Sequence, residues 1–261
     1  MIVMTQNLIF NMITPRIGQL TLSQPERRNA LNAQMWADLP KILDKAANTK
    51  GLRVLVVTGD GEHFASGADI SEFETLYATV ESAKKISDDI AAGFDALAKF
   101  PMPTIAMIRG ACVGGGCALA LCCDVRFADT TSKFAITPAK LGLVYPFSDV
   151  QRLIETVGIP HAKDMLFSAR VIQSKAARKM GLINQIFKVD NLKDKTLEYA
   201  EGITKLSPQT LKVTKQMFAA YQAGQSGETS QSMDWFLDGF SNDDFKNGYK
   251  AFLEKRKPDF S

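Results

Sequence analysis

Two glycine-containing turns hold the residues of this chain whose type and spacing are best suited to chemistry. One turn spans His63–Asp69 and the other spans Gly110–Ala118. Each follows an apolar run typical of a strand and precedes a predicted helix, so each can present backbone N–H groups with no side chain in the way. Two such amides that converge on one point would form an oxyanion hole, which stabilises an enolate or a similar anion.

The glycine triplet Gly114–Gly116 also has a purely structural interpretation. Its glycines would allow a strand and the following helix to pack closely together. Alternatively, the free amides at the positive end of that helix would face an anion. The triplet alone favours the structural interpretation, but its pairing with a second glycine turn after a buried strand favours an anion site.

Side chains beside the turns offer few alternatives to backbone chemistry. His63 could act as an acid or base, but we favour an exposed loop histidine, and His161 is interpreted as a surface residue. Asp69 is interpreted as a cap that accepts hydrogen bonds from local amides rather than as a catalytic carboxylate. Ser66 and Ser148 have no obvious histidine partner, so nucleophilic catalysis has little support.

Strands and helices alternate along the first part of the chain, which indicates an α/β fold. The almost wholly apolar helix at Cys117–Cys123 must be central, because it has no polar face to turn to solvent. Met35 and Trp36 are most simply core residues. The expected strands are 17–22, 52–58, 104–108, 125–128 and 133–136, and the expected helices are about 35–46, 70–79, 82–99 and 117–123.

The second part of the chain is predicted to be mainly helical, and no Gly-, Ser- or Pro-rich linker divides it from the first. The expected helix starts combine capping residues with proline at the first helical position. These starts are Ser148–Asp149, Pro160, Ser174, Ser207–Pro208 and Ser241, with Gly181 expected to end the helix that begins at Ser174.

The composition allows a large core and does not indicate a nucleic-acid or membrane partner. The chain has 261 residues, of which 46% are hydrophobic, and its net charge is +3. Basic residues are scattered among acidic ones, which argues against binding to nucleic acid or an anionic membrane. No apolar run approaches the ~18 residues of a membrane span, and no leader is recognisable, so we expect a cytoplasmic protein.

Four cysteines crowd into residues 112–123 without a CxxC pair. Small, buried, apolar thiols in a reducing compartment are the favoured interpretation, and no metal site is expected. These cysteines are Cys112, Cys117, Cys122 and Cys123.

Six segments together form a combination that is specific to one family. They are Pro25–Leu31, Phe64–Asp69, Gly110–Asp124, Leu141–Leu143, Ala177–Val189 and Ala251–Pro258. Through them the chain resembles the crotonase (enoyl-CoA hydratase/isomerase) superfamily over nearly its full length. The resemblance implies a spiral of ββα turns over residues 1–200 and a C-terminal helical trimerisation region over 201–261 within the same structural unit. It also implies acyl-CoA substrates, a homotrimer or hexamer, and no cofactor beyond the coenzyme A of the substrate.

The resemblance also assigns site residues. The oxyanion amides fall on Ala68 and Gly115. The basic residues near the expected coenzyme A could equally be solvated surface. The positions expected to contact substrate are Arg28, with its neighbour Arg27, Ala30, Ser66, Ala118, Pro138, Phe252 and Lys255.

Hydratases of this family carry two glutamates that position and activate a water molecule. Here those positions are Ala118 and Pro138, and neither can transfer a proton. Tyr145 lies in the loop after the second position and resembles the tyrosine of crotonase-type methylmalonyl-CoA decarboxylases, although those enzymes have a histidine in place of Ala68. Tyr145 either donates a proton or packs with its hydroxyl tied to backbone. Asp149 and Glu155 lie on the following helix, and either could reach the site.

Two classes of function follow. The first is an acyl-CoA enzyme of the hydratase/isomerase type that stabilises a thioester enolate. Within this class, decarboxylation of a malonyl-type acyl-CoA is the more specific alternative. The second is an acyl-CoA-binding protein without catalysis. Loss of both glutamates favours the second class, whereas the retained glycine turns and Tyr145 favour the first.

Overall fold

A computed structural model describes residues 2–260, and its centre is a seven-stranded sheet with the strand order β1-β2-β3-β4-β5-β7-β10. The first three strands pair antiparallel, and β3, β4, β5, β7 and β10 pair parallel. The strands of this sheet are β1 (Ile2–Met4), β2 (Leu8–Met12), β3 (Ile17–Leu22), β4 (Val54–Gly59), β5 (Thr104–Ile108), β7 (Val125–Asp129) and β10 (Gln185–Phe187).

A smaller sheet of three strands lies beside the large one. Its strands are β6 (Ala111–Val113), β8 (Lys133–Ala135) and β9 (Ile172–Gln173), in the order β6-β8-β9. Isolated bridges join Leu31 to Ala68 and Ala65 to Cys112. Through these bridges the segments around Leu31 and around Ala65–Ala68 pair in line with the small sheet. The chain therefore repeats one unit, in which a strand of the large sheet is followed by a short strand or bridge and then by a helix. This arrangement confirms the expected α/β spiral of ββα turns.

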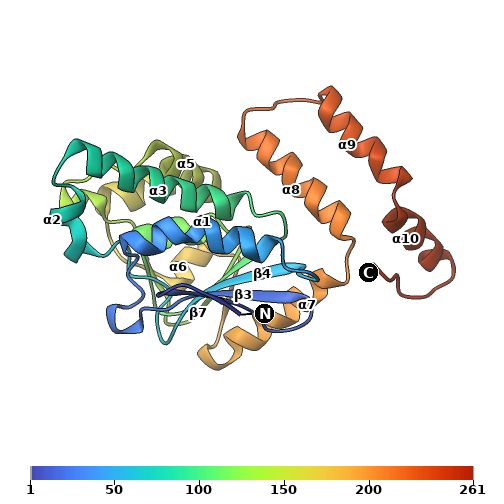
Figure 1. Cartoon of the computed structure of the whole chain (residues 1–261), viewed down its shortest axis with the longest axis horizontal. Helices are drawn as coiled ribbons and strands as arrows, with labels where there is room; N and C mark the ends of the chain where they lie inside the picture. Colours follow the sequence, from blue (N-terminus) through green and yellow to red (C-terminus); the bar gives the residue numbers. More distant parts are fainter. Residues whose placement is uncertain (1, 261) are drawn as a thin grey trace.

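Helices cover both faces of the large sheet, as Figure 1 shows, with α1 and α3 on one side and α7 on the other. Residues Leu192 and Ala200 of α7 pack with Val54, Val56 and Ile105 in one buried cluster. The helices are α1 (Ala33–Ala47), α2 (Phe73–Leu76), α3 (Val80–Ala98), α4 (Gly115–Leu121), α5 (Phe147–Ser168), α6 (Ser174–Lys179), α7 (Leu192–Thr204), α8 (Pro208–Gln222), α9 (Ser230–Ser241) and α10 (Asp243–Leu253).

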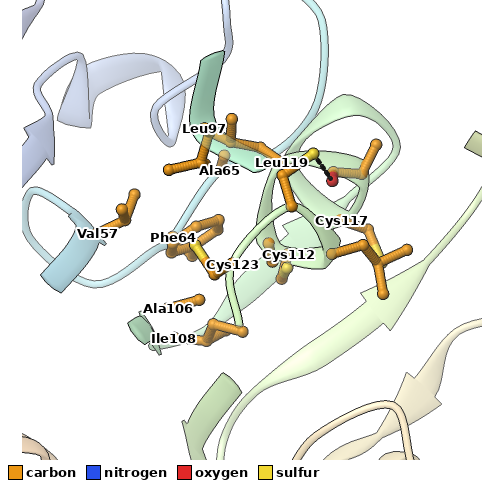
Figure 2. Close-up of a cluster of buried hydrophobic side chains, with 14 of the residues drawn as sticks. Val57, Phe64, Ala65, Leu97, Ala106, Ile108, Cys112, Cys117, Leu119 and Cys123 are labelled. Carbon is orange, nitrogen blue, oxygen red and sulfur yellow. Dashed lines mark hydrogen bonds between the residues drawn. The ribbon is translucent and has the colours of Figure 1, made fainter. Parts of the chain in front are cut away.

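Helix α4 is central, as expected, and every residue from Gly116 to Leu121 is buried. It lies so close to the first glycine turn that a Cβ on Gly116 would come within 2.6 Å of the Ala65 Cβ. Figure 2 shows Phe64 and Ala65 of that turn within the apolar cluster that also holds Cys112 and Leu119. The structural interpretation of the triplet is therefore correct for Gly116.

Helices α8, α9 and α10 extend away from the layered part of the molecule (Figure 1). They leave many large apolar side chains exposed: Met217, Phe218, Tyr221, Met233, Phe236, Leu237, Phe240, Phe245, Tyr249, Phe252 and Leu253. Between residues 2 and 260 no helix combines the length and hydrophobicity needed to cross a membrane.

Several expected elements agree with the structure in detail. Strands β3 and β5 have the expected bounds, Ser207 caps α8 by accepting from the Thr210 N–H, and Gly181 adopts a φ of 83° just after α6. The expected helical stretch 70–79 contains only a short 3-10 turn and α2. Strands β1, β2, β6, β9 and β10 were not expected.

Three expected caps were wrong. Helix α5 begins after Pro146, whose carbonyl accepts from the Asp149 and Val150 N–H groups, so Ser148 and Asp149 lie inside the first turn. Helix α10 is capped by Asn242 rather than Ser241, because the Asn242 side chain accepts from the Phe245 N–H. Ser174 is the first residue of α6, and its hydroxyl donates to the Thr130 carbonyl instead.

The close approach of α4 to the first turn predicts a selective cost for a single methyl group. Gly116→Ala should lower the free energy of unfolding by about 1–3 kcal/mol, because its Cβ overlaps backbone and side-chain atoms of Ala65. Gly202→Ala in α7 is the matched control, since its Cβ meets nothing within 4 Å and should stabilise the helix slightly. Urea denaturation of both variants is the measurement, and equal stabilities would contradict the packing argument.

Candidate active site

The two glycine turns are held together by backbone hydrogen bonds. The Ala65 N–H donates to the Ala111 carbonyl at 3.0 Å, and the Val113 N–H donates back to the Ala65 carbonyl at 3.0 Å. On its other side the first turn pairs with Leu31, whose N–H donates to the Gly67 carbonyl at 2.7 Å. The chain segment 28–31, the first turn and the second turn therefore form one continuous backbone assembly.

Ala68 and Gly115 each leave one amide N–H without a partner among residues 2–260. The bridge between Ala68 and Leu31 is formed by the residues on either side of Ala68. The Leu31 N–H donates to the Gly67 carbonyl, and the Asp69 N–H donates to the Leu31 carbonyl at 3.0 Å. The N–H of Ala68 itself points the other way, as alternation along an extended segment requires. Gly115 is the first residue of α4, where an N–H has no intrahelical acceptor.

The two unpartnered amides lie next to each other. A Cβ placed on Gly115 would be 3.8 Å from the Ala68 nitrogen, and a Cβ placed on Gly67 would be 3.8 Å from the Gly115 nitrogen. Each amide follows a glycine with positive φ, 112° at Gly67 and 53° at Gly114. Such angles are rare for residues with a side chain, so these glycines give both turns their shape.

Asp69 secures the end of the first turn. Its carboxylate accepts from the Ser71 N–H at 3.1 Å and from the Ser71 hydroxyl at 2.6 Å, and it pairs with Arg27 at 2.6 Å. These hydrogen bonds, with that from Ser71 the strongest, lower the pKa of Asp69 below its ordinary value of 3.8. The interpretation of Asp69 as a cap is confirmed, and Arg27 is tied to the turn.

The segment around Arg28 and Ala30 lies along the same turn. The Ser66 N–H donates to the Arg28 carbonyl at 3.0 Å, and the Ser66 hydroxyl donates to the Arg27 carbonyl at 3.1 Å. Arg28 is exposed, whereas Ala30 is buried beside it. The structure therefore brings Arg28, Ala30 and Ser66 to the edge of the paired turns.

Tyr145 packs against the apolar cluster that contains α4. Its hydroxyl is buried and has no hydrogen-bond partner among the described residues, so it is not tied to backbone. Burial, followed by the nearby Cys117 thiol and Asp149, raises the pKa of Tyr145 well above 10. The phenol is therefore protonated at neutral pH, with its proton available to an acceptor.

A sequence model described as Enoyl-CoA hydratase/isomerase matches residues 13–261 of this chain. The chain belongs to the enoyl-CoA hydratase/isomerase family. It is 34% identical over 247 residues to the 2,3-dehydroadipyl-CoA hydratase of Escherichia coli K12, covering 94% of this chain and 95% of that protein. It is 30% identical to the short-chain-enoyl-CoA hydratase of Clostridium acetobutylicum, with 93% of each chain covered.

Solved structures agree with this assignment. A family member from Hyphomonas neptunium is 40% identical, with a TM-score of 0.94 and coverage of 98% of this chain and 97% of that chain. An enoyl-CoA hydratase/carnithine racemase from Magnetospirillum magneticum reaches the same TM-score of 0.94 at 29% identity, covering 100% of this chain and 97% of that chain. The crotonase fold and an enzyme of the hydratase/isomerase type are therefore established for this chain.

In this family member, the carboxylates near the site are engaged in structural contacts. Asp149 is buried and pairs with Arg152 at 3.1 Å, and burial raises its pKa above 3.8 against the effect of that arginine. Glu155 is exposed and accepts from Gln222 at 3.0 Å. Ala118 is buried in α4, and Pro138 begins a 3-10 turn after β8. Neither of the last two offers a proton-transferring group.

Other candidates lie elsewhere or differ from expectation. His63 is half-buried and its Nδ1 accepts from the Ala111 N–H at 3.2 Å, so the expectation of an exposed loop histidine was wrong. His161 and Ser148 are exposed. Phe252 and Lys255 lie at the end of α10, which in Figure 1 is at the opposite end of the molecule from α2 and the turn before it. A single chain does not bring these two residues to the paired turns.

The four cysteines are buried free thiols, as expected. Burial raises the pKa of Cys122 to about 12, so it stays protonated and unreactive at neutral pH. Residues 2–260 hold no group of three or more His, Cys, Asp or Glu side chains placed to bind a metal ion.

Trp36 is the site residue that sequence reasoning missed. It is buried in the core as expected, but its indole Nε1 has no hydrogen-bond partner within residues 2–260. A Cβ on Gly115 would lie 3.5 Å from Trp36 Cζ2, so the indole borders the second turn. Trp36 lies in α1, far from Gly115 in the sequence, so no local pattern pointed to this contact.

Proposed function

We propose that this protein is an acyl-CoA enzyme that stabilises a thioester enolate between the amides of Ala68 and Gly115. The observation that carries the proposal is the pair of adjacent, unpartnered N–H groups, each following a glycine of positive φ. Relatives at 34% and 30% identity are named as hydratases of acyl-CoA thioesters, which supports the substrate class. Coenzyme A is then part of the substrate, and no further cofactor is proposed.

In this mechanism the thioester carbonyl oxygen accepts hydrogen bonds from both amides. Negative charge that develops on this oxygen strengthens both bonds, so the enolate is stabilised more than the ground-state thioester. The turns are prearranged by the hydrogen bonds of Ala65 and Leu31, so little reorganisation is needed when the charge forms. Arg28, Ala30, Ser66, Ala118 and Pro138 are proposed to contact the substrate around these amides.

Decarboxylation of a malonyl-type acyl-CoA is a second candidate, and the buried, unpartnered hydroxyl of Tyr145 favours it. Loss of CO₂ leaves the electron pair of the broken C–C bond on the thioester as an enolate, so no base is needed. The Tyr145 hydroxyl then donates its proton to the enolate carbon, and the phenolate recovers a proton from solvent. The absence of proton-transferring groups at Ala118 and Pro138 is compatible with this sequence of steps.

Removal of one donor amide tests the oxyanion proposal. Gly115→Pro should lower kcat about 10²–10³-fold, because it deletes one donor N–H while proline is tolerated in the first turn of a helix. Gly115→Ala is the matched control, since it keeps the N–H and its Cβ makes an ordinary 3.5 Å contact with Trp36. Turnover of crotonyl-, methylmalonyl- and ethylmalonyl-CoA is followed by mass spectrometry, which reads water addition, isomerisation and CO₂ loss together.

Equal turnover by Gly115→Pro and Gly115→Ala would contradict the oxyanion role of that amide. Tight binding of acyl-CoA without turnover of any substrate by the wild-type protein would instead support a binding protein without catalysis. The two results are separated by measuring affinity and turnover on the same preparations.

A substitution at Tyr145 distinguishes decarboxylation from the other reactions. Tyr145→Phe should lower CO₂ loss from methylmalonyl-CoA by about 10²-fold or more and leave coenzyme A affinity unchanged, since only the proton donor is removed. Tyr199→Phe in α7, a partly exposed tyrosine outside both the site and the apolar face of α8–α10, is the control. The pH profile of the wild-type enzyme should show no loss of this step up to pH 9, because the phenol stays protonated there. An unchanged rate in Tyr145→Phe would remove the residue from the mechanism.

We further propose that the exposed apolar face of α8–α10 binds second copies of this chain as a trimer or hexamer. Phe252 and Lys255 are expected near coenzyme A, yet they lie far from the paired turns of their own chain, so they could reach only a neighbour's site. Light scattering should give three or six times the chain mass, and Phe236→Glu with Phe240→Glu should dissociate the assembly. A wild-type monomer would overturn this proposal.

A further inference from the structure

The Trp36 indole borders the paired turns, and its buried N–H lacks an acceptor. Trp36 lies in α1 and is only 2% exposed. Four buried side-chain nitrogen or oxygen atoms within residues 2–260 have no hydrogen-bond partner, and Trp36 Nε1 is one of them. A buried donor left unpaired costs about 1–3 kcal/mol, so such a group in a functional protein calls for a physical explanation.

The indole ring borders the candidate oxyanion hole. Trp36 Cζ2 lies 3.5 Å from the Cβ position of Gly115, and the Ala68 nitrogen lies 3.8 Å from that same position. Nε1 and Cζ2 are bonded to the same ring carbon, so the N–H is on the same side of the ring as the atom that borders Gly115.

Packing and capping hold the indole in this orientation. The ring of Phe94 meets it edge-on, with ring centroids 5.0 Å apart. Gly93 of α3 leaves room for the opposite edge, since a Cβ there would lie 3.3 Å from Trp36 Cε3. The start of α1 is fixed by Asn32, which accepts from the Met35 N–H, and by Glu72, which accepts from the Ala33 N–H at 2.8 Å.

We propose that the Trp36 N–H binds an oxygen atom carried by the acyl group of the substrate, close to its thioester carbonyl. The preferred substrates are then acyl thioesters with a hydroxyl or carboxylate oxygen near C3, rather than plain alkyl chains. Binding such an oxygen satisfies a donor that is unpaired in the free protein, so the polar acyl group gains affinity that an alkyl group cannot. The inference rests on the proposed acyl-CoA function and adds the acyl class to it.

The chain contains two tryptophans, Trp36 and Trp235, so the indole proton can be observed directly. In ¹⁵N-labelled wild-type protein, 3-hydroxybutyryl-CoA or malonyl-CoA should move the Trp36 indole resonance downfield, whereas butyryl-CoA should leave it nearly unchanged. A shift with one polar ligand and not the other identifies the hydroxyl or the carboxylate as the source. Trp235→Phe assigns the two signals, and Trp235, on α9, serves as the internal reference.

Equal shifts with all three ligands would overturn the proposal, because the N–H would then bond to the thioester oxygen that they share. The absence of a shift with either polar ligand, although both bind, would overturn it as well. Failure of every acyl-CoA to bind would instead contradict the proposed function, so the two failures are distinguishable.

A variant gives an independent test by affinity. Trp36→Phe keeps an aromatic ring against Phe94 and deletes the donor. It should weaken binding of the preferred polar acyl-CoA by about 10-fold and leave butyryl-CoA binding nearly unchanged, as measured by calorimetry. A thermal unfolding curve checks that the variant is folded at the assay temperature. Equal losses for the polar and the alkyl ligand would indicate a packing role only and would overturn the proposal.

Discussion

The close contact between the two glycine turns is the constraint on which the rest of the site depends. Gly116 touches Ala65 so closely that no side chain fits between them, and backbone hydrogen bonds join Ala65 to Ala111 and Val113. This contact fixes the start of α4 against the first turn. The amides of Ala68 and Gly115 become neighbours as a consequence, although the sequence separates them widely.

Some of the unpaired polar groups of the fold border this contact or pack against the same apolar cluster. Trp36 and Tyr145 hold two of the four unpartnered buried side-chain atoms within residues 2–260, and the other two belong to Arg53 and Asp129. Trp36 borders Gly115, whose free amide lies next to that of Ala68. Each unpaired donor costs free energy in the unliganded fold. A ligand that offers acceptor oxygens to these donors recovers part of that cost.

Sequence reasoning predicted the parts of the molecule that depend on local pattern. The central α4, strands β3 and β5, the cap at Ser207 and the cap at Asp69 follow from apolar runs and short-range hydrogen bonds. Strands β6, β9 and β10 have only two or three residues, which is too short for a periodic pattern to show. The caps at Ser148 and Ser241 were wrong because neighbouring residues, Pro146 and Asn242, begin those helices.

The unpaired Trp36 N–H could not be predicted, because it depends on contacts with Gly93, Phe94 and Gly115 that are distant in sequence. This N–H is one of several uncharged donors around the paired turns. Asp69 and Asp149 are held in ion pairs with Arg27 and Arg152, whereas the unpartnered groups of Ala68, Gly115, Trp36 and Tyr145 are neutral donors. Neutral donors stabilise an anion but cannot remove a proton. A reaction that generates its enolate without a base, such as loss of CO₂, therefore demands less of this site than one that begins with proton abstraction.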